Sequence, residues 1–180
     1  MNEAPFRPKK ILEILIKHDV KCIVVGGIAT TLQAAPFPTS DVDICPALDT
    51  GNLDRLASAL KELQAVALAN DEPKGLKLEF SGKSLKKWLG DFRFLNLITA
   101  HGRLDLLYRP AGTQGYRDLL RDSVIKDIGG GVEVRIAALA DVIRSKQATG
   151  RRRDLEQLPT LRKLLEMQNE EDPGPEAIRP

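Results

Sequence analysis

The sequence predicts a mixed α/β fold, in which helices cover a sheet of parallel and antiparallel strands. Short runs rich in β-branched residues alternate with segments of helical periodicity in the first part of the chain, and two later β-rich runs flank a tight turn. Helical periodicity returns near the C-terminus. A chain of 180 residues is long enough for one domain with its own core.

The N-terminal part alternates helix and strand. Pro8 begins a predicted helix with apolar residues at helical spacing, and "KCIVV" predicts a short buried strand. Gly26 and Gly27 end that strand and open a helix to about Gln33. After a loop with two prolines, "SDVDICPA" predicts the next strand, and "NLDRLASALKELQAV" predicts an amphipathic helix with Asn52 as its N-cap.

The second part of the chain adds a hairpin, a strand and further helices. Residues 70–90 show no sustained period and predict a loop with a short helix or strand. "FRFLNLITA" and "RLDLLYRP" predict a hairpin that turns at His101 and Gly102. "GYRDLLRDSV" predicts a short helix, "GGGVEVRIA" a strand, and "ALADVIRSKQATG" a helix that breaks at Gly150 before "RRRDLEQLPTLRKLLEMQ" continues helically.

Domain organisation follows from these elements. We predict one domain over residues 1–168, helical from about residue 137, and a disordered tail over 169–180, whose apolar content is too low for packing. The apolar fraction of 42% and the absence of any apolar run near the roughly 18 residues of a membrane span predict a soluble protein with no membrane partner. The N-terminus does not resemble a secretory signal, so we expect a cytoplasmic location.

Two aspartates on the second predicted strand are the first candidates for chemistry. Asp41 and Asp43 are two residues apart and therefore project from the same face of a strand, while Val42 and Ile44 point into the core. Their charges repel each other unless both face water or a divalent cation neutralises them. Carboxylate oxygens suit Mg²⁺, and Mn²⁺ takes similar ligands. An exposed strand end with no metal is the alternative.

A third acid stands on the predicted hairpin. Asp105 interrupts the apolar run "RLDLLYRP", although an edge strand could simply direct it to solvent. If this strand pairs with the "DVDI" strand, three carboxylates converge, which is enough to hold two cations for an in-line phosphoryl displacement.

Gly26 and Gly27 are candidate phosphate binders. A glycine pair at a strand-to-helix turn lets the backbone approach a ligand and directs N–H groups toward an anion. An ordinary tight turn is the alternative. The G-x-G-x-x-G fingerprint and the phosphate-loop lysine pattern are both absent from the sequence, which argues against dinucleotide dehydrogenases and phosphate-loop NTPases.

Taken together, Gly26-Gly27, Asp41-Val-Asp43 and the later Asp105 resemble the DNA polymerase β-like nucleotidyltransferase superfamily. The stretch "LADVIRSKQATGRRRDLEQL" is similar to the signature of the AbiEii and MenT toxins, minimal nucleotidyltransferases of toxin-antitoxin pairs. The resemblance implies a minimal nucleotidyltransferase fold with C-terminal helices. It also implies transfer of a nucleoside monophosphate from an NTP to the 3′ end of tRNA, which blocks translation, and a cognate antitoxin as partner.

The resemblance also implies roles for residues. Asp41 and Asp43 would hold the cations, and Asp105 would complete one metal site and accept the hydroxyl proton. Gly26 and Gly27, with a hydroxyl from Thr39 or Ser40, would meet the β- and γ-phosphates.

Cations near the C-terminus fit the same chemistry. Lys146 and Arg153 are seven residues apart, so an uninterrupted helix would place them on one face to grip the triphosphate, whereas a break at Gly150 would alter that register. Arg151 and Arg152 are candidates for contact with an RNA backbone, with a solvated loop as the alternative.

A second basic run lies in the middle of the chain. Lys83, Lys86 and Lys87 flank Trp88 in "SGKSLKKWLG" and are further candidates for RNA contact. A phosphate on Thr39 or Ser40 would add about −1.5 to −2 charges beside the carboxylates, so these hydroxyls are candidate regulatory phosphorylation sites.

Two other functions remain open from the sequence. One is a nucleotidyltransferase that modifies an aminoglycoside or lincosamide, which would need an acidic pocket for a cationic drug. The other is a catalytically silent domain of the same fold that only binds a partner.

Overall fold

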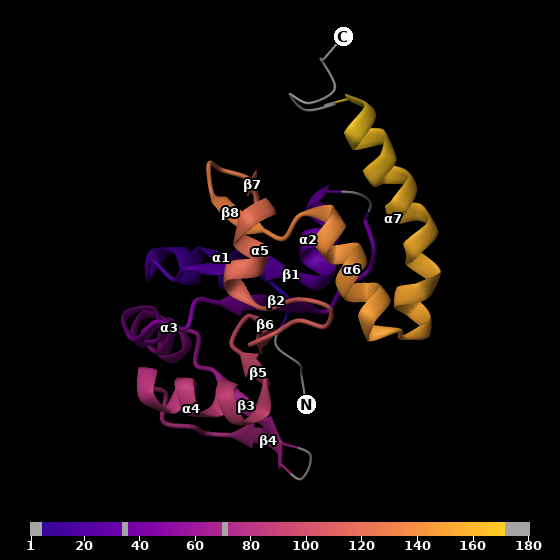
Figure 1. Ribbon diagram of the computed structural model, residues 1–180. Helices are drawn as coiled ribbons and strands as arrows, with labels where there is room; N and C mark the ends of the chain where they lie inside the picture. Colours follow the sequence, from indigo (N-terminus) through magenta and orange to yellow (C-terminus); the bar gives the residue numbers. More distant parts are fainter. Residues whose placement is uncertain (1–4, 34–35, 70–71, 172–180) are drawn as a thin grey trace.

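The α/β fold class is confirmed. The computed structural model describes residues 5–33, 36–69 and 72–171, which form one mixed sheet flanked by helices (Figure 1). The strands are β1 (Cys22–Val25), β2 (Asp41–Pro46), β3 (Val66–Ala69), β4 (Glu72–Leu76), β5 (Phe94–Thr99), β6 (Gly102–Leu107), β7 (Val124–Asp127) and β8 (Glu133–Ile136). The helices are α1 (Pro8–Lys17), α2 (Gly26–Gln33), α3 (Thr50–Glu62), α4 (Gly82–Phe92), α5 (Tyr116–Asp122), α6 (Leu139–Thr149) and α7 (Arg152–Glu171).

The eight strands lie in the order β4-β3-β5-β6-β2-β1-β8-β7. The pairs β2–β6 and β1–β8 are parallel, and the other neighbouring pairs are antiparallel. The predicted hairpin is the antiparallel pair β5–β6, which turns at His101. Because β6 also pairs with β2, the hairpin strand and the "DVDI" strand are neighbours at the centre of the sheet.

Alternation along β6 and the first four residues of β2 separates a core face from an outer face. Val42 and Ile44 of β2 and Leu104 and Leu106 of β6 have no exposed surface, whereas Asp43 and Asp105, which lie between them, are partly exposed. Successive side chains of a strand point to opposite faces, so burial of these aliphatic residues fixes the acids of both strands on the outer face.

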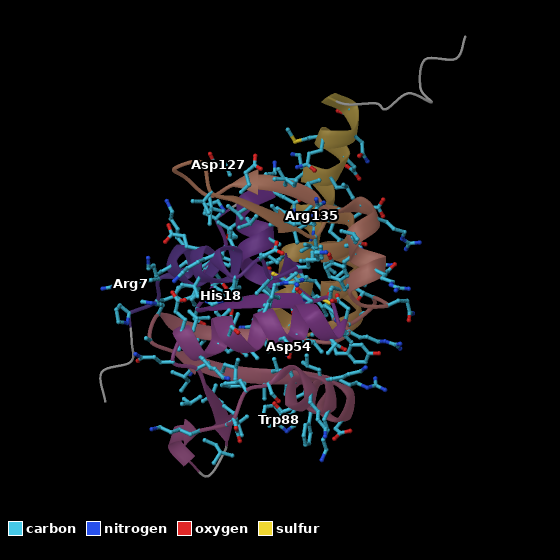
Figure 2. All side chains as sticks on the ribbon, turned by 90° about the vertical axis from the view of Figure 1, so that its left-hand side faces the viewer. Arg7, His18, Asp54, Trp88, Asp127 and Arg135 are labelled. Carbon is cyan, nitrogen blue, oxygen red and sulfur yellow. The ribbon has the colours of Figure 1, made fainter. Side chains whose placement is uncertain are left out.

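Two groups of helices flank the sheet (Figure 1). In the first group, α3 contacts both α1 and α4, and Asp54 of α3 accepts a hydrogen bond from the Gly82 amide at the start of α4 at 3.1 Å. Figure 2 shows Asp54 and Trp88 on these two neighbouring helices, and Trp88 packs edge-on against Phe80. In the second group, α6 contacts both α2 and α7.

Several predicted local features differ from the structure. The N-cap of α3 is Asp49, whose side chain accepts a hydrogen bond from the amide of Asn52, so the prediction of Asn52 as the cap is wrong. Asn52 is instead buried and donates to the carbonyls of Lys21 and Ala47, which ties α3 to the end of β2. The two residues compete for the cap because both have short polar side chains that can accept from the backbone.

The weakly patterned middle of the chain contains more regular structure than the sequence indicates. Within 70–90 the structure has β4 and most of α4, whose N-terminus is closed by a capping box between Ser81 and Ser84. β3 begins at Val66, the last residue of the predicted helix "NLDRLASALKELQAV", and β7 begins at Val124, the last residue of the predicted helix "GYRDLLRDSV". β4 and β7 are the two edge strands of the sheet, each with a single neighbour, and β3 lies next to β4; the hydrophobic pattern is weak in these strands.

The C-terminal helix α7 follows the break at Gly150, which has a φ of +68°. It continues to Glu171, so residues 169–171 of the predicted tail are helical, and residues 172–180 lie outside the described residues. None of the helices in the described ranges combines the length and apolar composition needed to cross a membrane.

Candidate active site

Three carboxylates meet on the outer face of the central strands. The parallel register of β2 and β6 places Asp43 opposite Asp105 and Asp41 opposite Arg103. One carboxylate oxygen from each of Asp41, Asp43 and Asp105 lies within 4.8 Å of the others. The convergence that the sequence made conditional on strand pairing is therefore present.

The proximity of these acids perturbs their ionisation. Burial, followed by the charges of Asp41 and Asp105, raises the pKa of Asp43 to about 7. Burial and the charge of Asp41 raise the pKa of Asp105 to about 6. The positive charge of Arg151 lowers the pKa of both carboxyl groups and so offsets part of this rise.

The donor set fits a divalent cation. Three partly buried carboxylates that repel one another gain most when a cation neutralises them, and hard oxygen ligands are those that Mg²⁺ and Mn²⁺ take. Neighbouring side chains orient two of the acids: Thr39 Oγ1 lies 3.0 Å from Asp41 Oδ1, and Asn96 Nδ2 donates to Asp105 Oδ2 at 3.2 Å. Such hydrogen bonds to ligand carboxylates are typical supports of a metal site.

The glycine pair at the start of α2 makes room for this cluster. Gly26 has a φ of +62°, and a Cβ at this position would lie 2.0 Å from Asp43 Oδ2. A Cβ at Gly27 would lie 2.4 Å from Thr39 Oγ1. The site thus requires glycine at both positions for close approach of side chains, whatever further contact these residues make with a phosphate.

A cleft of about 790 Å³ opens over the three acids. Its lining includes every residue of the predicted catalytic and nucleotide-binding set: Gly26, Gly27, Thr39, Ser40, Asp41, Asp43, Asp105, Lys146 and Arg153. The lining comes from the end of β1, from α2, β2, β5, β6, α6 and α7, and from connecting segments. A cleft of this size accommodates a nucleotide together with part of an acceptor.

The predicted cations divide into two sets. Lys146, Arg151 and Arg153 line the cleft, and Lys146 forms an ion pair of 3.1 Å with Asp154 across the break between α6 and α7. Arg152 points away, with 94% of its side chain exposed, and pairs with Glu156. The sequence grouped Arg151 with Arg152 as RNA contacts, whereas the structure places Arg151 beside the acids.

The remaining predicted RNA contacts lie outside the cleft. Lys83, Lys86 and Lys87 are exposed on α4. Their spacing of three and four residues places them on one face of the helix.

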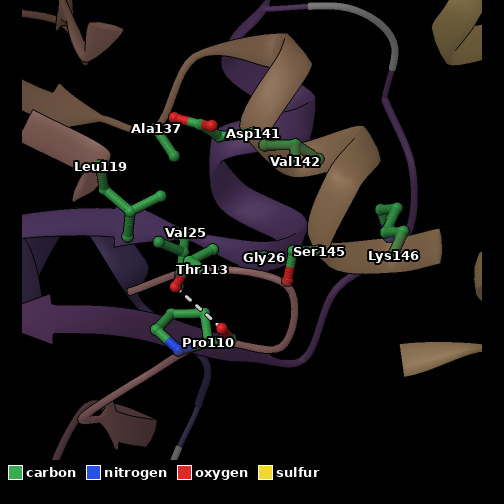
Figure 3. Close-up of a pocket in the computed structure, with 10 residues that line it drawn as sticks. All are labelled: Val25, Gly26, Pro110, Thr113, Leu119, Ala137, Asp141, Val142, Ser145 and Lys146. Atoms are coloured by element: carbon green, nitrogen blue, oxygen red, sulfur yellow. Dashed lines mark hydrogen bonds between the residues drawn. The ribbon is translucent and has the colours of Figure 1, made fainter. Parts of the chain in front are cut away.

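A second, small cavity adjoins the cleft between α6 and the segment from Pro110 to Thr113 (Figure 3). Thr113 closes this segment by donating from its hydroxyl to the Pro110 carbonyl at 2.8 Å. Asp141 lines the cavity, and within the described residues its buried Oδ2 has no hydrogen-bond partner. A volume of about 30 Å³ holds one or two waters, so this cavity is no substrate site.

Several residues of the cleft wall were missed from the sequence, among them Arg93, Phe94, Asn96 and Arg109. The signal for Asn96 is its position in the hairpin, because β5 pairs it with Asp105. Arg93 and Phe94 were placed in the predicted hairpin strand "FRFLNLITA", but the structure ends α4 at Phe92, makes Arg93 its C-cap and begins β5 at Phe94.

Comparison with solved structures identifies the fold. The lincosamide antibiotic adenylyltransferase LnuA, solved with lincomycin bound, aligns with a TM-score of 0.57 and 12% identity over 89% of this chain and 99% of its own. The antibiotic-resistance factor ANT(2″)-Ia aligns with a TM-score of 0.54 and 12% identity over 87% of this chain and 81% of its own. The chain has the nucleotidyltransferase fold. No protein-family model matches the sequence, and no curated protein matches it significantly.

The nucleotidyltransferase fold confirms the coarser part of the resemblance. A fold hosts many activities, so the chemistry of this chain has to be argued from its own cleft. The acidic triad is consistent with the divalent metal that the nucleotidyltransferase reaction requires.

Proposed function

We propose that this chain is a metal-dependent nucleotidyltransferase that transfers a nucleoside monophosphate from an NTP to an acceptor hydroxyl. The observation that carries this proposal is the convergence of Asp41, Asp43 and Asp105 in a cleft whose wall also contains Lys146, Arg151 and Arg153. The acids are suited to cations at the reacting phosphate, and the basic residues to the anionic triphosphate.

In this reaction the acceptor oxygen bonds to the α-phosphorus while the bond from that phosphorus to the pyrophosphate oxygen breaks. Asp41, Asp43 and Asp105 would hold Mg²⁺ or Mn²⁺, which neutralises charge on the transferring phosphoryl group and activates the attacking hydroxyl. Asp105, which lies within 4.8 Å of both other acids, would accept the proton of that hydroxyl.

The triphosphate fits the side of the cleft formed by α2, α6 and α7. Arg151 and Arg153 are exposed there, and Gly26 and Gly27 bring backbone N–H groups close to the acids. Thr39 and Ser40 add hydroxyl groups to the same side. Lys146 is held near Asp43 by Asp154 and would stabilise charge on the departing pyrophosphate.

For the acceptor we propose the 3′ end of tRNA, which would make the chain a toxin held in check by a cognate antitoxin. This proposal rests on the resemblance of the α6–α7 sequence to the AbiEii and MenT toxins and on the surplus of basic residues around the cleft. The exposed lysines of α4 supply further positive charge for an RNA backbone.

An antibiotic acceptor is the second candidate, because LnuA and ANT(2″)-Ia share the fold. The charges of the cleft disfavour it. Its lining acids are the three of the triad and Asp154, and Asp154 is already paired with Lys146. Once the triad holds a cation, no acid of the described lining is left for a cationic drug.

We also propose Thr39 and Ser40 as sites of regulatory phosphorylation. Both line the cleft, and Thr39 contacts Asp41 directly. A phosphate on either residue would repel the triphosphate. Intact-mass measurement after co-expression with the neighbouring gene tests this, and a silenced protein of unmodified mass would contradict it.

The decisive experiment incubates the purified protein with total tRNA, Mg²⁺ and each α-labelled NTP in turn, beside an Asp41→Ala control. Label on RNA that depends on Asp41 supports the proposal and identifies the nucleotide. Label on a lincosamide or aminoglycoside instead would support the second candidate. No label on any acceptor, with folded protein and metal, would leave a silent binding domain and overturn the proposed activity.

A further inference from the structure

The wall of the cleft away from α6 and α7 combines an exposed aromatic side chain with arginines. Arg93 and Phe94, at the junction of α4 and β5, line this wall together with Arg109. Phe94 is 56% exposed, although a phenylalanine in a central hairpin normally packs inward. The Phe94 ring shares this wall with the two arginines, and proteins that bind single-stranded nucleic acids combine aromatic rings with arginines for base stacking and backbone contact.

The strand register fixes the position of Phe94 relative to the acids. In the β5–β6 ladder, Asn96 pairs with Asp105 and Phe94 pairs with Leu107. Residues two apart on a strand point to the same face, so Phe94 lies on the face that carries Asp105, about 7 Å further along the sheet. A group stacked on Phe94 would therefore stand one nucleotide or less from the reacting centre.

The direction of the proposed reaction assigns this wall to the acceptor. An in-line displacement places the attacking and leaving oxygens on opposite sides of the phosphorus. If Lys146, Arg151 and Arg153 hold the triphosphate on the α6–α7 side, the acceptor hydroxyl has to approach from the β5–β6 side. Asp105 of the acidic triad stands on β6, on this acceptor side.

Beyond Arg93, the positive surface continues along α4. Lys83, Lys86 and Lys87 share one exposed face of this helix, and Asp91 is the acid exposed on it. The C-terminus of α4 leads directly into Arg93. The lysines are thus positioned to follow a phosphate backbone away from the cleft.

We propose that Arg93 and Phe94 form the acceptor subsite, in which Phe94 stacks on the terminal base of a single-stranded RNA 3′ end and Arg93 contacts its phosphate. The RNA backbone then runs along the lysines of α4, and Arg152 on α7 plays no part in binding it. This inference rests on the proposed nucleotidyl transfer for the direction of approach. The stacking surface itself is tested by binding, without turnover.

The test measures fluorescence anisotropy of a fluorescein-labelled single-stranded RNA with a free 3′-hydroxyl, with Mg²⁺ and without NTP. Phe94→Ala should raise the Kd for this RNA at least about fivefold, the lower range for loss of one stacked base. Phe92→Ala is the matched control, because Phe92 is 64% exposed and lies outside the cleft lining. Its Kd should equal that of the unmodified protein.

Charge variants test the path of the backbone. Arg93→Ala should weaken RNA binding and reduce the slope of log K against log salt by about 0.7, the value for one single-strand phosphate contact. The double variant Lys86→Ala, Lys87→Ala should reduce the slope further, while Arg152→Ala should leave it unchanged. Thermal stabilisation by NTP with Mg²⁺ should be the same in all these variants.

Two results would overturn the inference. One is that the unmodified protein does not bind the RNA, and the other is that the Phe94→Ala and Arg93→Ala variants bind it as tightly as the unmodified protein. Failure of the proposed activity gives a different pattern. In that case no NMP is transferred to any acceptor, yet RNA binding still depends on Phe94. Conversely, transfer to RNA that is insensitive to Phe94 and Arg93 would leave the activity standing and remove the subsite.

Discussion

Replacing Asp43 by asparagine should stabilise the metal-free protein. Asparagine keeps the shape of the side chain and removes a charge that both burial and two neighbouring carboxylates oppose. The amide also offers a donor to Asp41 or Asp105. Asp91→Asn on the exposed surface of α4 is the matched control, and it should have little effect.

The magnitude follows from the pKa of Asp43, which rises from 3.8 to about 7 on folding. At 1.36 kcal/mol per pKa unit, ionised Asp43 costs the folded state roughly 4 kcal/mol. Part of this is offset when a polar amide replaces the carboxylate, so we expect a gain of about 2–4 kcal/mol. For a chain of this length that is a rise in Tm of roughly 5–15 °C.

The effect should depend on pH with a defined sign. A carboxyl group whose pKa is higher in the folded state binds its proton more tightly there, so the unmodified metal-free protein loses stability as pH rises from about 4 to about 7. Asp43→Asn removes the part of this loss near pH 7. Part of the loss that comes from Asp105 remains: repulsion between Asp43 and Asp105 is reciprocal and disappears in the variant, but burial and the charge of Asp41 still raise the pKa of Asp105.

The assay is thermal unfolding followed by circular dichroism, in EDTA and in Mg²⁺, at about pH 6 and about pH 8. In EDTA at the higher pH, the variant should melt above the unmodified protein, and Mg²⁺ should stabilise the unmodified protein much more than the variant. A variant that melts lower in EDTA, or one that Mg²⁺ stabilises equally, would refute the assignment of Asp43 to a repulsive, cation-binding cluster.

Three further predictions concern the scaffold of the site, each measured by urea denaturation. Gly27→Ala should lower the free energy of unfolding by about 1–3 kcal/mol, because its Cβ would lie 2.4 Å from Thr39 Oγ1. Gly90→Ala is the control and should not lower it, because a Cβ there meets nothing within 4 Å. Equal effects of the two substitutions would contradict the crowding argument. Asp154→Ala should lower the free energy of unfolding by about 3 kcal/mol, because it leaves Lys146 unpaired and partly buried. Arg152→Ala, which removes an exposed ion pair, should lower it by less than about 0.5 kcal/mol. The reverse order would refute the role of the Lys146–Asp154 pair. Asp49→Ala should cost about 1 kcal/mol through loss of the α3 cap, and an unchanged midpoint would contradict that assignment.

The acidic triad could be predicted from the sequence because local patterns determine it. Asp41 and Asp43 share a face wherever their strand lies, and the interruption of an apolar run marks Asp105 as a polar position of the outer face. Only the pairing of β2 with β6 remained to be learned from the structure, since a parallel contact between distant segments leaves no signal in either one.

The cleft wall formed by Arg93, Phe94 and Arg109 was not predicted, although the sequence placed Arg93 and Phe94 on the hairpin strand. Nothing in the local pattern shows that this strand end lies beside the acids, and α4 was not predicted as a full helix because Gly82, Gly90 and many charged residues hide its period. The function of Lys146 also depends on tertiary structure. Gly150 breaks the helix, and the turn that follows brings Asp154 against Lys146, an ion pair that the seven-residue spacing to Arg153 does not indicate.

The stability of the fold and the geometry of the site have one physical origin. Val42, Ile44, Leu104 and Leu106 are fully buried, and each contributes about 1.5–3 kcal/mol to folding. A slip of one residue between β2 and the core would expose these side chains and bury the acids, so the register that brings Asp43 and Asp105 together is also the most stable one. The repulsion within the triad is therefore sustained by the core on the opposite face of the same two strands. A cation that relieves the repulsion should add stability without moving either strand.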